Sequence, residues 1–191
     1  MVQMIAEQRL AVADEAGHAL TRVRMGLSWD KERGGGVIGA TADVDLDATA
    51  LQFAGGRLFD LAFYNNLRTR DGSVEHLGDN RSGSGAGDDE TIAVDLGAVH
   101  GPVDTILFLV SSYRGQALEW VTNAACHLST EDGTELAHFT LTQGPRETGV
   151  VMAALTRGDA GDPWTLEAVG RGVPITVPTQ GLEALAPFVQ R

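Results

Sequence analysis

Short apolar segments separated by turn residues recur along the chain, and extended helical periodicity is largely missing. Glycine-rich segments at 34–36, 55–56, 83–87 and 158–161 are typical of turns that join strands. The pattern predicts strands at 20–29, 42–53, 58–64, 91–94, 105–111, 124–129, 135–142, 150–156 and 164–170. We therefore expect an all-β fold, a two-sheet antiparallel β-sandwich.

Two of the predicted strands indicate where the core lies. The run ILFLV at 106–110 is apolar on both faces, as expected of a central strand that is covered on both sides. The strand at 42–53 changes from charged to apolar along one face, where Asp43, Asp45 and Asp47 precede Thr49, Leu51 and Phe53. We expect its apolar half to be buried between the sheets and its acidic half to meet metal or water.

The C-terminal residues follow a different period. Leu182, Leu185, Ala186 and Val189 have helical spacing. They predict a short C-terminal helix that Thr179 caps, that Pro187 disturbs, and that serves packing.

The composition limits the class of protein. A chain of 191 residues is long enough for one domain with a sizeable core, and we read 1–191 as that single domain. The net charge of −12 leaves no basic footprint for nucleic acid, so a direct DNA or RNA partner is not expected. The same charge disfavours anionic membranes, unless bound Ca²⁺ bridges acidic protein to acidic lipid.

The location is predicted from three features. Cys126 is the only cysteine, which fits a reducing compartment, and its apolar surroundings indicate a small buried side chain. The N-terminal residues lack the apolar run of a signal peptide, and no stretch approaches the length of a transmembrane helix. We expect a cytoplasmic protein.

The segment 71–90, DGSVEHLGDNRSGSGAGDDE, holds six carboxylates and five glycines against one arginine. Such a segment suits a hard cation, because Ca²⁺ takes six to eight oxygen ligands from a backbone that must bend sharply. The alternating aspartates at 43–47 add carboxylates on one strand face. Zn²⁺ and Cu²⁺ are less suited to a site without thiolate ligands, and Mg²⁺ requires a tighter octahedral coordination than Ca²⁺. We expect His76 to be a hydrogen-bonding turn residue.

Other motifs do not fit their patterns. An EF-hand beginning at Asp43 would place Ala48 and Ala54 where glycine and glutamate are needed. The glycines at 83–87 precede three acids rather than the lysine of a phosphate-binding loop. Ser73, His76 and Asp79 are crowded in one loop, which is more typical of turn chemistry than of a catalytic triad. Catalysis therefore has no positive signal.

Taken together, the acidic motifs and several other segments resemble the tellurium-resistance and stress-response TerD family. The resemblance covers about 20–172 and rests on GLSWD (26–30), DVDLDATAL (43–51), FYNNL (63–67), DGSVEHLGDN (71–80), GAGDDE (85–90), SSYRGQ (111–116) and VTNAACHL (121–128), followed by GTELAHFTL (133–141) and WTLEAVGRG (164–172). It implies a Ca²⁺-binding β-sandwich associated with resistance to tellurite and other chemical stresses. One branch of the family is described as binding cyclic AMP.

The resemblance also implies a ligand set. The side chains carried over are those of Asp45, Asp47, Asn65, Asp71, Asp79, Asn80, Asp88, Asp89 and Glu90, with Asp43 a weaker candidate and the main-chain carbonyls of Gly72 and Val74 as helpers. This set exceeds the requirement of one Ca²⁺, which predicts two neighbouring ions.

The functional hypothesis is a non-enzymatic Ca²⁺-binding stress protein. It would act through a partner or ligand surface that the metal organises, the partner being an unidentified protein such as another stress-resistance protein. Two alternatives stay open: a hydrolase-like enzyme with a Ca²⁺-supported site, and a small-ligand or cyclic-nucleotide module.

Overall fold

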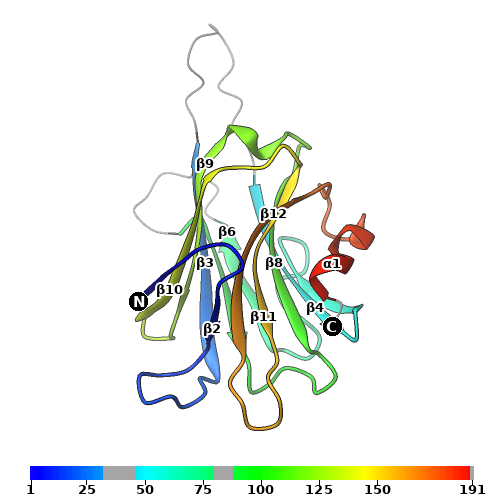
Figure 1. The fold of residues 1–191 in the computed structure, drawn as a ribbon. Coiled ribbons are helices and arrows are strands. Elements are labelled where there is room, and N and C mark those ends of the chain that lie inside the picture. Colours follow the sequence, from blue (N-terminus) through cyan, green and yellow to red (C-terminus); the bar gives the residue numbers. More distant parts are fainter. Residues whose placement is uncertain (32–45, 80–87, 190–191) are drawn as a thin grey trace, which may run out of the picture.

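The chain folds into two six-stranded sheets that pack face to face (Figure 1). The computed structural model describes residues 1–31, 46–79 and 88–189. Its strands are β1 Val2–Met4, β2 Arg9–Ala11, β3 Arg22–Lys31, β4 Leu46–Ala54, β5 Arg57–Ala62, β6 Val74–Asp79, β7 Glu90–Asp95, β8 Thr105–Ser112, β9 Val121–Ser129, β10 Glu135–Gln143, β11 Gly149–Thr156 and β12 Thr165–Val173. The helical turns are η1 Leu118–Trp120, η2 Leu182–Leu185 and α1 Ala186–Val189. The predicted all-β sandwich is confirmed.

The strand order explains which segments meet. The first sheet runs β1-β10-β9-β3-β7-β6 and the second β2-β12-β11-β8-β4-β5. Neighbouring strands are antiparallel except β1, which pairs with β10 in parallel. All nine predicted strands are present, although 42–45 lie outside the described residues. Three strands were not predicted: β1 and β2 have only three residues each, and β6 lies inside the segment read as a cation loop.

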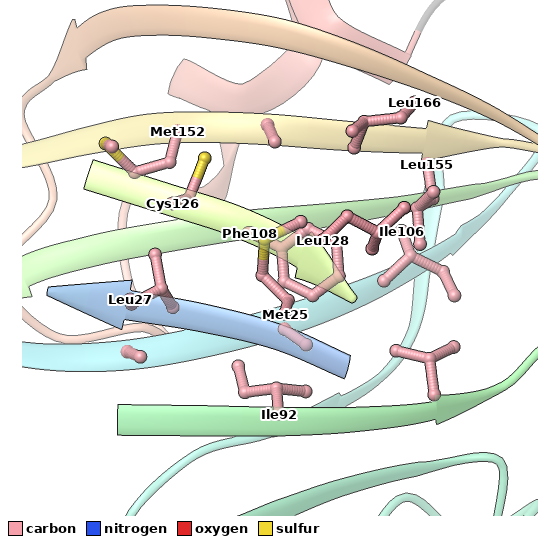
Figure 2. Packing of buried hydrophobic residues seen from close by; sticks show 14 of the residues in the cluster. Met25, Leu27, Ile92, Ile106, Phe108, Cys126, Leu128, Met152, Leu155 and Leu166 are labelled. Atoms are coloured by element: carbon pink, nitrogen blue, oxygen red, sulfur yellow. The ribbon is translucent and has the colours of Figure 1, made fainter. Parts of the chain in front are cut away.

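The inner faces of both sheets form the main core (Figure 2). Met25, Ile106 and Phe108 are fully buried there and lie with Cys126 between the sheets. Burial raises the pKa of the Cys126 thiol to about 12, so this side chain is the small buried residue that the sequence indicated. Every residue of β8 is buried, which confirms a central strand covered on both sides.

A second apolar cluster covers the outer face of the second sheet. Leu51 and Leu107 pack there with Leu185 and Val189, so the C-terminal segment lies across β4 and β8 (Figure 1). The prediction that the apolar half of β4 is buried between the sheets was therefore wrong. Alternation along the strand directs Ala48, Ala50 and their neighbours inward, and Leu51 and Phe53 outward beneath the C-terminal segment.

The C-terminal helix forms, but it begins differently from the prediction. Gly181, with φ of 69°, is the residue before η2, and no side chain caps this turn. The Thr179 cap was therefore wrong, because a left-handed glycine makes the entry instead. Pro187 lies inside α1, where the first turn tolerates a missing N–H. Among the described residues, no helix is long and apolar enough to cross a membrane.

Candidate metal centre

Four acidic residues lie at one end of the sandwich. At this end β3 and β6 finish while β4 and β7 begin (Figure 1). Asp47 is the second residue of β4, Asp88 and Asp89 precede β7, and Glu90 opens it. We call these four residues the acidic end.

Asp89 is fixed by the backbone of β3. Its own N–H donates to the carbonyl of Leu27 at 2.9 Å, and its Oδ2 accepts the N–H of Trp29 at 2.9 Å. The first bond holds the backbone of Asp89 beside β3, and the second orients its carboxylate toward the same strand. Segment 26–30 therefore positions an acid that lies about sixty residues further along the chain.

Glu90 joins the two sheets. Its carboxylate is 2% exposed, and Oε2 accepts the N–H of Ala48 at 2.5 Å. Ala48 lies beyond the last pair of β4 with β5, Ala50 with Ala62, so the carboxylate takes the place of a strand partner. His76 Nε2 lies 3.0 Å from the same oxygen. His76 forms the hydrogen bonds expected of it, but from β6 rather than from a turn.

Asp88 turns onto the solvent side of the first sheet. Its Oδ2 lies 3.3 Å from Nε2 of His127 in β9, above Gly26 in β3. The hydrogen bond with Asp88, opposed by partial burial, raises the pKa of His127. The three consecutive acids thus contact different strands: Asp88 contacts β9, Asp89 contacts β3, and Glu90 contacts β4 and β6.

Asp47 and Asn65 lie at the same end of the paired strands β4 and β5. Asp47 pairs with Ser111 across β4 and β8. Tyr64 follows β5, which pairs with β4 as far as Ala62 opposite Ala50. Burial raises the pKa of Tyr64, and the negative charge of Asp47 raises it further. Asn65 follows Tyr64 in an exposed turn. The predicted ligands Asp47 and Asn65 therefore belong to the same end.

Asp71 has a different environment. Oδ1 accepts the Thr69 hydroxyl at 2.7 Å and both the N–H and hydroxyl of Ser73, while Oδ2 accepts the N–H of His100 at 3.0 Å and the amide of Gln52 at 3.2 Å. Partial burial would raise the pKa of Asp71, but these donors outweigh it and lower that pKa to about 2. The carboxylate already has five donors.

The main-chain carbonyls of Gly72 and Val74, predicted as additional metal ligands, accept hydrogen bonds in the same region as Asp71. That of Gly72 accepts the Arg68 guanidinium at 3.3 Å, and that of Val74 accepts the N–H of Thr69 at 3.0 Å. We call Asp71 and its partners Gln52, Thr69, Ser73 and His100 the far end.

The two ends are separated along β4. Glu90 binds Ala48, whereas Asp71 binds Gln52 four residues later. A strand rises about 3.3 Å per residue, so these contacts lie roughly 13 Å apart. One ion cannot hold ligands from both ends, because Ca²⁺–oxygen distances are about 2.3–2.6 Å.

The remaining predicted ligands are Asp43, Asp45, Asp79 and Asn80. Asp43, Asp45 and Asn80 lie outside the described residues, as does the side chain of Asp79. Within the described part, no three His, Cys, Asp or Glu side chains are arranged around a single metal position. Carboxylate oxygens are the donor type that suits a hard cation, and an open hollow at this end is lined by Asp88, Asp89 and Glu90 together with Arg24, Leu77, Gly78 and Thr91. The carboxylate of Glu90 itself is buried.

Sequence reasoning missed two residues of this site. His127 contacts Asp88, and Gly26 leaves room for that contact. Both lie in segments that carried the resemblance, GLSWD and VTNAACHL, but their meeting depends on the pairing of β3 with β9. Trp29 and Ala48 donate through their backbone N–H groups, so the type of side chain at these positions could not have indicated their role.

A two-sheet β-sandwich with an acidic end is the class that these observations define. The TerD domain model matches residues 1–187, so the chain belongs to the TerD-domain family. The match extends beyond the residues that carried the sequence resemblance.

Individual relatives agree with this assignment. The chain is 36% identical to tellurium resistance protein TerZ of Serratia marcescens over 175 residues, covering 89% of each chain. It is 40% identical to tellurium resistance protein TerD of Alcaligenes sp over 164 residues, covering 81% of this chain and 82% of the relative. It is 33% identical to stress response protein SCP2 of Bacillus subtilis (strain 168), covering 80% and 83%.

The fold has also been observed experimentally in a similar protein. The crystal structure of a homologue of telluride resistance protein (TerD) from Streptomyces coelicolor A3(2) has a TM-score of 0.64 and 22% identity, covering 86% of this chain and 96% of that one. This likeness supports the fold.

Proposed function

We propose that this protein binds Ca²⁺ at the acidic end and acts in resistance to tellurite or other chemical stress. The family supports the biological role, since its relatives carry the names tellurium resistance and stress response proteins. The metal role rests on one observation: three consecutive acids, Asp88, Asp89 and Glu90, are each oriented by a different strand.

The physical reason is charge repulsion. Asp47, Asp88, Asp89 and Glu90 concentrate negative charge at one end of a protein that is already at −12. Folding fixes these carboxylates at one end of the protein, and a bound divalent cation would offset the repulsion.

The proposed ligands are the carboxylates of the acidic end together with Asn65 and the predicted side chains of Asp43, Asp45, Asp79 and Asn80. Asp71, Gly72 and Val74 are left out of this set because they lie at the far end, roughly 13 Å from the acidic end along β4. Bound Ca²⁺ would supply positive charge and a fixed arrangement of oxygens. The number of ions is read from the stoichiometry of a titration.

The protein itself is proposed to act without catalysis, through a surface that a protein partner recognises in the Ca²⁺-loaded state. Calorimetric titration of metal-free protein with CaCl₂ tests the binding, with MgCl₂ as the comparison. Capture from extracts of tellurite-stressed cells, with and without chelator, tests the surface. Absence of heat with CaCl₂ refutes the metal role, and identical captured proteins in both conditions refute the partner role.

A further inference from the structure

The contact of Asp88 with His127 shows how one carboxylate of the acidic end is oriented. Asp88 Oδ2 lies 3.3 Å from His127 Nε2, and both side chains are about a quarter exposed, at 25% and 24%. Oδ1 has no hydrogen-bond partner among the residues that the structure describes. One oxygen of Asp88 thus contacts His127, and Asp88 also lines the hollow that Arg24, Asp89 and Glu90 share with Leu77, Gly78 and Thr91.

Gly26 makes this contact possible. It lies in β3 between Thr91 of β7 and His127 of β9. A Cβ built on Gly26 would overlap Asp88 Oδ2 and the His127 ring at distances that real atoms do not reach. Because φ of Gly26 is not in the left-handed region, glycine is needed here for space and not for backbone conformation.

The His127 imidazole has a parallel neighbour in β10. Its ring stacks on that of His138, with centroids 6.4 Å apart and an interplanar angle of 4°. His138 in turn contacts the Thr140 hydroxyl at 2.8 Å and Glu135 at 3.6 Å. The His127 ring therefore has His138 of β10 as a parallel neighbour as well as its contact with Asp88.

We propose that His127 and Gly26 are positioning residues for cation binding: Gly26 opens the space in which His127 holds one oxygen of Asp88, leaving the other directed to the ion. This inference rests on the proposed Ca²⁺ site. Groups that orient metal ligands typically change metal affinity by about 10–100-fold when they are removed.

The test uses the whole protein and CaCl₂ as the probe, with affinity from calorimetry and the melting temperature of the metal-free state measured in parallel. We expect His127→Ala to weaken Ca²⁺ binding by about 10–100-fold. His127→Gln should restore much of the affinity, because the glutamine amide nitrogen is as many bonds from Cα as Nε2. A purely structural role would move the melting temperature but not this pattern of loss and rescue.

Gly26→Ala gives a second approach that leaves both contact residues intact. It should weaken Ca²⁺ binding at least as much as His127→Ala. Gly101→Ala, where an added Cβ meets nothing, and His18→Ala, an exposed histidine, are the controls and should bind as the wild type does.

The outcomes separate the two proposals. If wild type fails to bind CaCl₂, the proposed function falls. If wild type binds and His127→Ala binds equally or more tightly, the positioning role is overturned while the cation site stands. If His127→Gln is as weak as His127→Ala, donation from Nε2 is not what positions Asp88, and the proposal is again overturned.

Discussion

The acidic end and the far end both contain buried or half-buried carboxylates from the same acidic motifs, yet they satisfy them differently. At the far end five donors converge on the single carboxylate of Asp71 and lower its pKa to about 2. At the acidic end three consecutive acids each receive donors from a different strand. An aspartate surrounded by donors stabilises the fold by itself, whereas clustered carboxylates need a counter-ion.

The largest effect on stability is expected at the far end. Asp71→Ala removes the acceptor for five donors and should lower the free energy of unfolding by about 2–4 kcal/mol, measured by urea denaturation without metal. Asp162→Ala, at an exposed residue, should change stability by less than about 0.5 kcal/mol. Ca²⁺ affinity of the folded Asp71→Ala protein should stay within twofold of wild type; a tenfold loss would place Asp71 among the ligands.

Ca²⁺ itself should stabilise the protein by a similar amount. A ligand at a hundred times its Kd adds about 2.7 kcal/mol when it binds only the native state. For a chain of this size that corresponds to roughly 5–10 °C in melting temperature. Calorimetric scans with chelator and with CaCl₂ measure the shift, and superimposable scans would contradict the metal site.

The third effect is on affinity rather than stability. Asp47→Asn and Asp89→Asn should each weaken Ca²⁺ binding at least tenfold, which is about 1.4 kcal/mol, because each removes a charge from the ion's surroundings. Asparagine at 89 can still accept the Trp29 N–H, so stability without metal should hold or rise. Asp162→Asn controls for net charge. Equal, small effects in all three variants would indicate a diffuse acidic surface.

The smallest effect is a dependence of stability on acid. Because the pKa of Asp71 falls from an ordinary 3.8 to about 2 on folding, its stabilisation is complete above about pH 4 and is lost as the pH falls toward 2. The difference in stability between metal-free wild type and Asp71→Asn should therefore shrink across this range. A difference that stays constant would mean that the hydrogen bonds to Asp71 do not depend on its charge.

The sequence predicts the sandwich well, because period-two alternation and glycine turns report directly on strands. ILFLV at 106–110 is central in the fold as expected. The sequence could not show that β6 runs through the acidic segment and carries Val74 and Asp79 to opposite ends of one strand. Composition groups these residues together, whereas strand geometry separates them. Nor could residue types reveal that Gly26 and His127 meet at Asp88, since this depends on the pairing of three strands.

Backbone amide resonances offer the most direct comparison of the two ends. The N–H groups of Trp29 and Ala48 donate to Asp89 and Glu90, whereas those of Ser73 and His100 donate to Asp71. In an NMR titration of metal-free protein with CaCl₂, the Trp29 and Ala48 amides should shift saturably while the Ser73 and His100 amides stay in place. Shifts confined to Ser73 and His100, or no saturable shift at either end, would contradict a cation site at the acidic end.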